Sequence, residues 1–320
     1  MTRRLAAMLV MLALLAMFAT LAPTRAFAQV QGGTARGSVD TDPAPSTRPP
    51  ASMAEVKIPS HGARMNGIVY LAAGPGAHPV VIFLHGYPGN ERNLDLAQAV
   101  RRAGYQAVYV DIRGMWGSGG TFSFGNGLED ADAVTAWVRD PAITAKYHFD
   151  VRRIAIVGHS FGGWLSLMTG SRQPPTVCVA GLAAWNIGWV GQRFRAHPDE
   201  RASNLDYFRQ TTDAGSGPVR GRAMEMVSEM ATHVTDWNYL SRASGFRDRA
   251  LLLVSATRDT PDEDVAMHRK MADAVRKAGG RHVTTVEYED DHPFSSHRIA
   301  LASVLTRWLD AECARAQTGR

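Results

Sequence analysis

The chain has 320 residues, of which 45% are hydrophobic, 20% charged and 8% aromatic. These proportions belong to an ordinary globular protein with enough apolar residues for a sizeable core. Two cysteines, 30 glycines and 16 prolines exclude disulfide-stapled and collagen-like chains, and the composition is not that of a disordered chain. The formal net charge is +5, and the 28 residues at the start contribute three arginines and no acid, which leaves +2 on the remainder. A scattered, near-neutral charge argues against nucleic acid or an anionic membrane as a partner.

Residues 1–28 have the pattern of a secretory signal peptide. Arg3 and Arg4 precede an uncharged, mostly aliphatic run from Leu5 to Ala22, and Ala26-Phe27-Ala28 places small residues at the positions that a signal peptidase reads. The pattern predicts cleavage after Ala28 and an exported protein, periplasmic or secreted, with no stable membrane insertion afterwards. The alternative is an uncleaved anchor, because this run of 18 residues approaches the roughly 20 that span a bilayer.

Residues 29–53 are rich in Gly, Ser, Thr, Pro and Asp and contain almost no aliphatic residues. Such a segment cannot bury enough apolar surface to offset its ordering entropy, so we predict a flexible linker. The folded domain is expected to occupy residues 54–320, a length that suits one α/β domain.

Short apolar runs bounded by turn residues alternate with helical patterns along this domain. Most runs are continuous Val, Ile and Leu, which is typical of strands buried on both faces of a parallel sheet. This alternation predicts a doubly wound, mostly parallel α/β sheet that binds its ligand at the carboxyl ends of the strands. The expected strands are 55–60, 67–72, 80–84, 107–111, 154–157, 177–184, 251–255 and 283–288, and the expected helices are 91–103, 128–138, 161–171, 262–277 and 297–314.

One connection, residues 187–246, breaks this rhythm. A structureless loop of about sixty residues is implausible inside a compact domain, so we predict an inserted helical cap over the sheet. Its helices are expected at Asn204–Thr211 and, following Pro218, at Arg222–His233.

The segment Gly158-His159-Ser160-Phe161-Gly162-Gly163 contains the pattern G-x-S-x-G. The pattern is weak alone, but here it directly follows a buried strand-like run and directly precedes a helical segment. A strand–turn–helix context forces the serine into a tight, exposed turn, and the glycines permit close approach of neighbouring chain. We therefore predict that Ser160 is a nucleophile. The alternative is a Gly-rich turn with an idle serine.

A serine nucleophile requires a general base, and the base requires a carboxylate that orients it. For this kind of elbow the three residues follow one another along the chain in the order serine, acid, histidine. Four histidines follow a plausible acid: His268, His282, His292 and His297. His268 lies inside a predicted helix, and His282 lies at the amino end of a strand. His292 follows the last strand, at the carboxyl end where the serine also emerges. We predict His292 as the base, with His297 as the alternative.

Asp259 is predicted to orient the base, because it stands at the exit of the apolar run 251–256. The acids at 262–264 occupy the first turn of the next helix, where they stabilise the helix dipole and need no catalytic role. The run Glu289-Asp290-Asp291 beside His292 lacks clear metal-ligand spacing, so we interpret these residues as solvated loop acids. No metal and no organic cofactor is expected.

An acyl-transfer intermediate also requires hydrogen-bond donors for its oxyanion. The backbone N–H of Phe161 is one candidate. The other comes from the loop after the strand at 80–84, where Pro88 has no N–H and the Tyr87 amide is therefore the best candidate. The Tyr87 phenol is an alternative donor, and His85 is expected to brace this loop.

The predicted cap and its borders are rich in aromatic residues and methionine. Such residues at helical spacing are usually core, but above a catalytic serine they suggest an apolar acyl or aromatic binding site. The side chains expected to contact substrate are Trp116, Trp185, Trp189 and Trp237.

Cys178 and Cys313 are 135 residues apart and have no metal-ligand spacing. An exported protein can join them in a disulfide, but Cys178 lies in an apolar strand-like run, where a free buried thiol is equally common. The sequence leaves both states open.

From about Ala54 to Cys313 the chain resembles the α/β-hydrolase superfamily, through the elbow above, the HGYPGN loop at 85–90, DIRGMWGSGG at 111–120 and SATRDTPD at 255–262. GHSFGG together with DDHPFSSHR is similar to the catalytic domains of prolyl-oligopeptidase-like serine hydrolases. In these, a histidine two residues before a Phe is the base, and His292-Pro293-Phe294 fits that arrangement. The sequence departs from true oligopeptidases in two respects. It has no room for their large N-terminal propeller, and the inserted cap is instead a feature of many esterases and lipases. Ser160 fits neither the Asp of dehalogenases nor the Cys of dienelactone hydrolases.

We therefore predict an exported serine hydrolase that cleaves a small-molecule carboxylic ester through an acyl-enzyme. The first alternative is a serine peptidase or amidase of the prolyl-oligopeptidase-like type that acts on short peptides. The second is a non-catalytic binding protein on the same scaffold. The acyl chain length and the oligomeric state cannot be read from the sequence.

Overall fold

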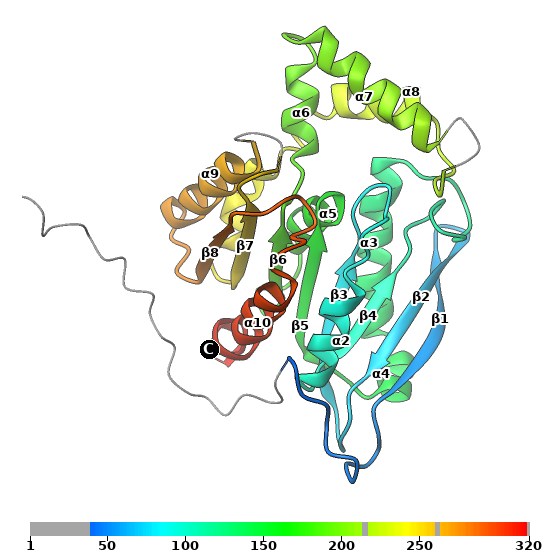
Figure 1. Cartoon of the computed structure of the whole chain (residues 1–320), viewed down its shortest axis with the longest axis vertical. Helices are drawn as coiled ribbons and strands as arrows, with labels where there is room; N and C mark the ends of the chain where they lie inside the picture. Colours follow the sequence, from blue (N-terminus) through cyan, green and yellow to red (C-terminus); the bar gives the residue numbers. More distant parts are fainter. Residues whose placement is uncertain (1–38, 213–216, 260–262, 319–320) are drawn as a thin grey trace, which may run out of the picture. The chain divides into compact units, whose positions relative to one another are not determined.

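The computed structural model describes residues 39–212, 217–259 and 263–318. Within them an eight-stranded sheet has the order β1-β2-β4-β3-β5-β6-β7-β8 (Figure 1). The pairs β1–β2 and β2–β4 are antiparallel and the other pairs are parallel, which confirms the predicted mostly parallel sheet. The strands are β1 Ser52–Ser60, β2 Ala63–Leu71, β3 His78–Leu84, β4 Gln106–Val110, β5 Phe149–His159, β6 Cys178–Leu182, β7 Leu251–Ala256 and β8 Val283–Tyr288.

Helices cover both faces of this sheet. In β3, Val80, Ile82 and Leu84 pack into one apolar cluster, while Val81 and Phe83 pack into the other. Successive strand residues point to opposite faces, and here both faces are buried, so the strand reads as one continuous apolar run. The helices outside the predicted cap region are α2 Leu94–Arg102, α3 Phe124–Arg139, α4 Pro141–Tyr147, α5 Phe161–Gly170, α9 Glu263–Lys277, α10 Arg298–Trp308, a π-helical turn Leu309–Cys313 and α11 Ala314–Thr318.

The two cysteines are joined in a disulfide. Cys178 begins β6 and Cys313 ends the π-helical turn, so the bond attaches the C-terminal helical segment to the sheet. The structure therefore decides between a disulfide and a free buried thiol, which the sequence left open.

At the N-terminal side, β1 begins at Ser52, three residues before the predicted strand and inside the segment predicted as linker. Ser52 and Met53 pair with Leu71 and Tyr70 of β2, and the guanidinium of Arg102 donates to the carbonyl of Val39 at 2.6 Å. The predicted signal peptide, residues 1–28, lies outside the described residues. Within the described ranges, every helix is too short or too polar to cross a membrane.

Between β6 and β7 the chain forms α6 Ile187–Arg193, α7 Pro198–Thr211, α8 Ala223–Thr232 and the 3₁₀ helix η1 Tyr239–Phe246. The helices α6, α7 and α8 stand beyond one end of the sheet (Figure 1). The helices predicted at 204–211 and 222–233 correspond to α7 and α8, but α7 begins six residues earlier than predicted. Pro198 at the first helical position and acids in the first turn are ordinary start signals for this helix. The sequence did not predict α4, α6 and η1.

Candidate active site

Ser160 lies at the turn between β5 and α5, with φ 56° and ψ −119°. A non-glycine residue with positive φ is strained, and such residues concentrate at functional sites. The flanking glycines are required by packing. A Cβ on Gly158 would lie 1.8 Å from the carbonyl oxygen of Gly162, and a Cβ on Gly162 would lie 2.0 Å from the carbonyl oxygen of Leu84. The turn therefore closes only without side chains at these two positions.

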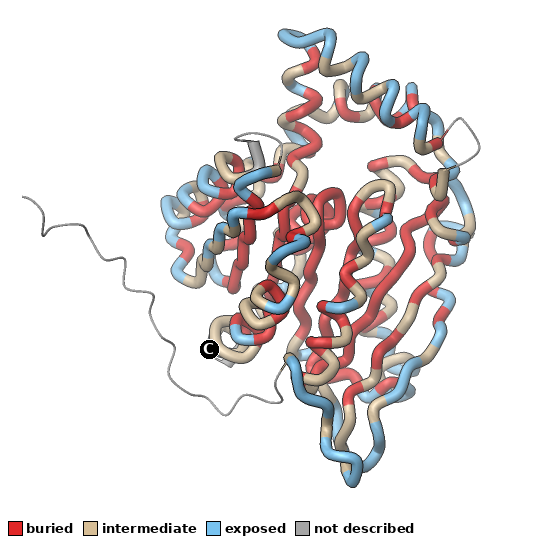
Figure 2. Tube along the Cα trace, viewed as in Figure 1, coloured by how far each residue is buried: buried red, intermediate tan, exposed pale blue. Residues whose placement is uncertain are grey.

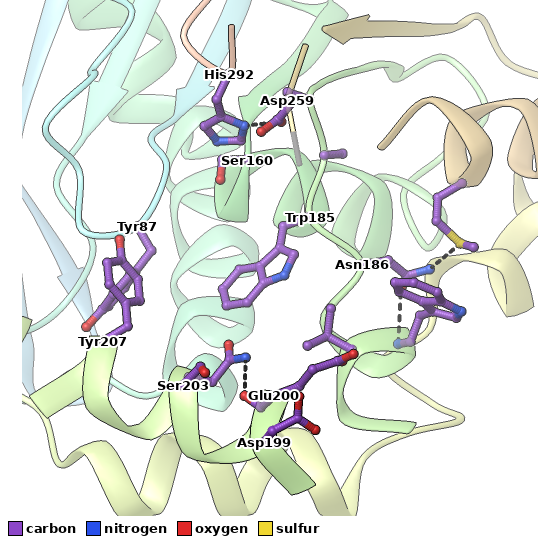
Figure 3. Close-up of a pocket in the computed structure, with 16 residues that line it drawn as sticks. Tyr87, Ser160, Trp185, Asn186, Asp199, Glu200, Ser203, Tyr207, Asp259 and His292 are labelled. Carbon is purple, nitrogen blue, oxygen red and sulfur yellow. Dashed lines mark hydrogen bonds and ion pairs between the residues drawn. The ribbon is translucent and has the colours of Figure 1, made fainter. Parts of the chain in front are cut away.

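Asp259 and His292 come together from the loops after two neighbouring strands, β7 and β8. The Asp259 carboxylate is hydrogen-bonded to Nδ1 of His292. Figure 3 shows Ser160 next to the His292 ring, and all three residues line one pocket. Because a carboxylate only accepts, it stabilises the proton on Nδ1 and leaves Nε2 with the lone pair that a general base needs.

His159, which belongs to the elbow, holds the backbone of the loop that carries His292. Its Nε2 lies 2.9 Å from the carbonyl oxygen of His292, and the two rings are 4.6 Å apart. Burial, reinforced by the charge of His292, lowers the pKa of His159 to about 3. The ring is therefore neutral near pH 7, and its Nε2–H donates to the carbonyl. This contact cannot be predicted from the sequence, because nothing local relates position 159 to position 292.

The two predicted oxyanion donors come from the loop after β3 and from the start of α5. Phe161 is the first residue of α5, so its N–H has no acceptor within the helix. Tyr87 follows β3 and lines the pocket, but its phenol is hydrogen-bonded to Thr211 of α7. The structure therefore places the phenol against α7, in disagreement with the alternative in which it serves the oxyanion.

His85 braces the loop that carries Tyr87. One ring nitrogen, Nδ1, lies 2.7 Å from the carbonyl oxygen of Gly86, and the other accepts the N–H of Ile112 at 3.2 Å. Burial lowers the pKa of His85, which keeps the ring neutral and able to accept. This geometry agrees with the bracing role expected from the sequence.

The interpretation of residues 289–291 as solvated acids is wrong for Asp290, which has no exposed surface. Burial alone would raise the pKa of its carboxyl, but hydrogen bonds from His297 and from the N–H groups of Asp291 and Ser296 outweigh burial and lower the pKa to about 2. His297, the alternative base, has its Nδ1 2.8 Å from Asp290 and is not among the described residues that line the pocket.

The pocket that contains Ser160 has a volume of about 600 Å³. Trp185 and Trp189 line it, as predicted, but Trp116 and Trp237 are not among its described lining residues. Trp237 is buried against Trp164 at a ring distance of 5.4 Å, and the indole of Trp116 donates to the carbonyl of Pro88 at 2.9 Å. Composition alone could not separate pocket tryptophans from packing tryptophans.

One side of α7 supplies a polar wall of the pocket that was not among the predicted site residues. Asp199, Glu200, Ser203, Asn204 and Tyr207 line the pocket, and their three- and four-residue spacing puts them on one helix face. Figure 3 shows Trp185 between this wall and Ser160. Glu200 is paired with Arg193 of α6, and this hydrogen bond lowers the pKa of the Glu200 carboxyl. Helical spacing was the signal that could have found these residues.

No group of three or more His, Cys, Asp or Glu residues within the described part of the chain is arranged to hold a metal ion.

A serine at a strand–turn–helix elbow, in one pocket with an Asp–His pair beyond the ends of parallel strands, is the arrangement of the α/β-hydrolase class. The chain belongs to the alpha/beta hydrolase family, whose family model matches residues 81–304. Membership of this family supports an enzyme with hydrolase activity. A search of curated proteins found no match.

Solved structures share this fold at low sequence identity. An esterase of Pyrococcus furiosus is 16% identical, with a TM-score of 0.56 over 82% of this chain and 93% of that one. An acylaminoacyl peptidase of Pyrococcus horikoshii is 16% identical, with a TM-score of 0.59 over 82% of this chain and 42% of that one. Dipeptidyl peptidase 4 of Porphyromonas gingivalis is 18% identical, with a TM-score of 0.58 over 82% of this chain and 36% of that one. At these identities the likeness concerns the fold alone.

Proposed function

We propose that the protein is a serine hydrolase that cleaves carboxylic esters through an acyl-enzyme. The observation that carries this proposal is the strained Ser160 beside the hydrogen-bonded Asp259–His292 pair, in one pocket. An idle serine in a Gly-rich turn needs no such pair, and a binding protein needs no activated nucleophile.

In the proposed mechanism the Ser160 oxygen attacks the ester carbonyl, and its proton passes to Nε2 of His292. Asp259 holds the imidazolium through Nδ1–H, and the N–H groups of Tyr87 and Phe161 bind the oxyanion, where one donor is typically worth about 10²- to 10³-fold in rate. The tetrahedral intermediate collapses as His292 returns the proton to the leaving alcohol. Water, deprotonated by the same histidine, then releases the acid and restores Ser160.

The walls of the pocket favour an ester with an apolar or aromatic acyl group. Three aromatic side chains, Tyr87, Trp185 and Tyr207, line the space between Ser160 and α7 (Figure 3). Aromatic walls with a few polar groups are typical of small-molecule sites.

Peptide cleavage is the second candidate, since two structures of similar fold are named as peptidases. An amine is a poor leaving group that must be protonated, so a matched ester and amide separate the two activities. We expect the ester to react more than tenfold faster, and an amide rate within tenfold of the ester rate would reverse this order.

Export is part of the proposal. It is supported by the predicted signal peptide and by the Cys178–Cys313 disulfide, because disulfides persist in oxidising compartments. Mass spectrometry of the protein recovered from the periplasm or medium of an expressing cell should find an N-terminus at Gln29. A chain that retains residues 1–28 would contradict cleavage.

The central test is labelling with a fluorophosphonate, followed by intact mass and peptide mapping. We expect one adduct, on Ser160, that is lost in Ser160→Ala and retained in Ser203→Ala, a matched change of a serine that also lines the pocket. A folded protein that forms no adduct, or turnover that survives in Ser160→Ala, would favour the binding-protein alternative or another mechanism.

A further inference from the structure

Asp290 is a carboxylate with no exposed surface, two residues before His292. Its Oδ1 accepts the N–H of Asp291 at 2.9 Å. Its Oδ2 accepts the N–H of Ser296 at 2.9 Å and lies 2.8 Å from Nδ1 of His297. These contacts close the loop between β8 and α10 around a single carboxylate, and His292 lies within the closed segment.

The same residue also contacts the loop that carries Asp259. The N–H of Arg258 donates to the carbonyl of Asp290 at 3.0 Å, and the Arg258 guanidinium lies 3.4 Å from Oδ1. Arg258 immediately precedes Asp259. One residue therefore joins the two loops whose side chains must meet as Asp259 and His292.

Asp290 and His297 form a second Asp–His pair that resembles the first but differs in its surroundings. The His297 ring stacks on Tyr288 at 4.8 Å, and neither member of the pair is among the described residues that line the pocket. Because the second pair lies outside the described lining of the pocket that contains Ser160, we interpret it as a contact that holds the loop.

We propose that Asp290 is a positioning residue that holds His292 and Asp259 in register for proton transfer from Ser160, an inference that rests on the proposed function. A carboxylate suits this place, because the partners that it has among the described residues are donors: two backbone N–H groups, the guanidinium of Arg258 and the His297 ring. An asparagine has the same shape, but its NH₂ group must face one of these donors, which leaves the loop loosened without a cavity.

The test is Asp290→Asn in the full-length protein, with Asp291→Asn as the matched control. Asp291 is a partly exposed acid on the same loop. Its carboxylate accepts the N–H of Ser295, and asparagine can still accept that bond. Two quantities are measured for each variant: the rate constant of fluorophosphonate labelling and the final number of adducts per chain. The rate reports the alignment of the reacting groups, whereas the final number reports how much protein is folded.

For Asp290→Asn we expect a labelling rate about 10- to 100-fold lower, with one adduct per chain at completion, since a displacement of about 1 Å can cost 10²-fold. For an ester substrate kcat should fall by a similar factor with KM nearly unchanged, because Asp290 does not line the pocket. Asp291→Asn should remain within twofold of the unsubstituted protein. An unchanged labelling rate with fewer adducts per chain would mean that Asp290 acts only in folding. Equal losses of rate in Asp290→Asn and Asp291→Asn would mean that only the charge of the loop matters. Either result would overturn the inference.

A second pair of variants decides the matter if Asp290→Asn does not fold. His297→Ala removes one donor to the carboxylate from a partly exposed position, whereas His297→Asn retains an N–H at nearly the same place. We expect His297→Ala to label at least threefold more slowly than His297→Asn, and equal rates would overturn the inference. Failure of the proposed function is a separate result, because it would appear as labelling or turnover that survives in Ser160→Ala.

Discussion

The sheet and the segment between β6 and β7 are built in opposite ways. All residues of β4, β6, β7 and α5 are buried. In α7, by contrast, Phe208 is the one buried residue of 14. Figure 2 shows this difference as buried central strands of the sheet and a mostly exposed α7. A densely packed region holds reacting groups to fractions of an ångström, whereas a helix with one buried residue can shift. We therefore expect changes near the sheet to alter kcat and changes near α7 to alter KM.

Specific contacts join the segment 187–246 to the rest of the domain near the pocket. The Glu229 carboxylate accepts the N–H of Phe124 at 2.8 Å, at the start of α3. The Tyr87 phenol bonds to Thr211, and the ring of Phe208 lies 5.4 Å from that of Tyr87. Because these contacts are specific, each can be removed without disturbing the elbow.

The largest effect is expected at the base. His292→Ala should lower kcat by a factor on the order of 10⁵ to 10⁶, because without proton removal the serine hydroxyl is a weak nucleophile. Steady-state kinetics with an activated ester would measure this loss. The alternative base provides the control, since His297→Ala should lose far less. A His292→Ala variant within tenfold of the unsubstituted protein would show that the catalytic assignment is wrong.

The next effect is expected at the pocket wall. Trp185→Ala should raise KM for an aromatic ester about 10- to 100-fold with a smaller change in kcat, because burying a large apolar group is worth about 1.5–3 kcal/mol. Trp137→Ala is the matched control, since that ring packs against Tyr147 at 5.9 Å and does not line the pocket. Equal KM values in the two variants would mean that substrate does not contact Trp185.

A smaller effect is expected in how the free energy of unfolding changes at acid pH, because of a buried histidine beside the sheet. Burial lowers the pKa of His268 to about 3, and the ring accepts the N–H of Ala184 at 3.2 Å. Below the ordinary histidine pKa of about 6.5 the unfolded chain binds a proton that the folded chain does not. Stability contributed by this site is therefore complete above pH 6.5 and falls by about 1.4 kcal/mol per pH unit between pH 6 and 4.

The variant His268→Gln keeps an acceptor near Ala184 and cannot titrate in this range. Denaturant unfolding at pH 7, 6 and 5 should therefore show a shallower loss of stability in the variant than in the unsubstituted protein. If the two proteins lost the same free energy of unfolding between pH 7 and pH 5, His268 would not remain neutral in the fold.

The smallest effect is expected where Thr211 of α7 meets Tyr87, in the loop after β3. Tyr87→Phe removes the hydrogen bond to Thr211, which is worth about 1 kcal/mol, so KM should rise up to about fivefold. The amide of residue 87 is unchanged, so kcat should remain within twofold. A 100-fold loss of kcat would instead identify the phenol as the oxyanion donor.

Local patterns in the sequence determined the sheet and the principal residues of the site. A strand buried on both faces reads as an apolar run wherever it occurs, and the elbow consists of consecutive residues, so both are visible without tertiary structure. Asp259 and His292 follow from the rule that parallel strands end at one edge. The resemblance to α/β-hydrolases pointed to the same residues.

Tertiary structure alone decided the features that depend on distant contacts. Asp290 reads as a loop acid, and only the packing of β7, β8 and α10 around it makes it a buried anchor. The same holds for Trp185, which lines the pocket, and Trp237, which packs behind it, and for the disulfide between Cys178 and Cys313. In each case the residue type allows two environments, and the choice between them depends on contacts that no local pattern records.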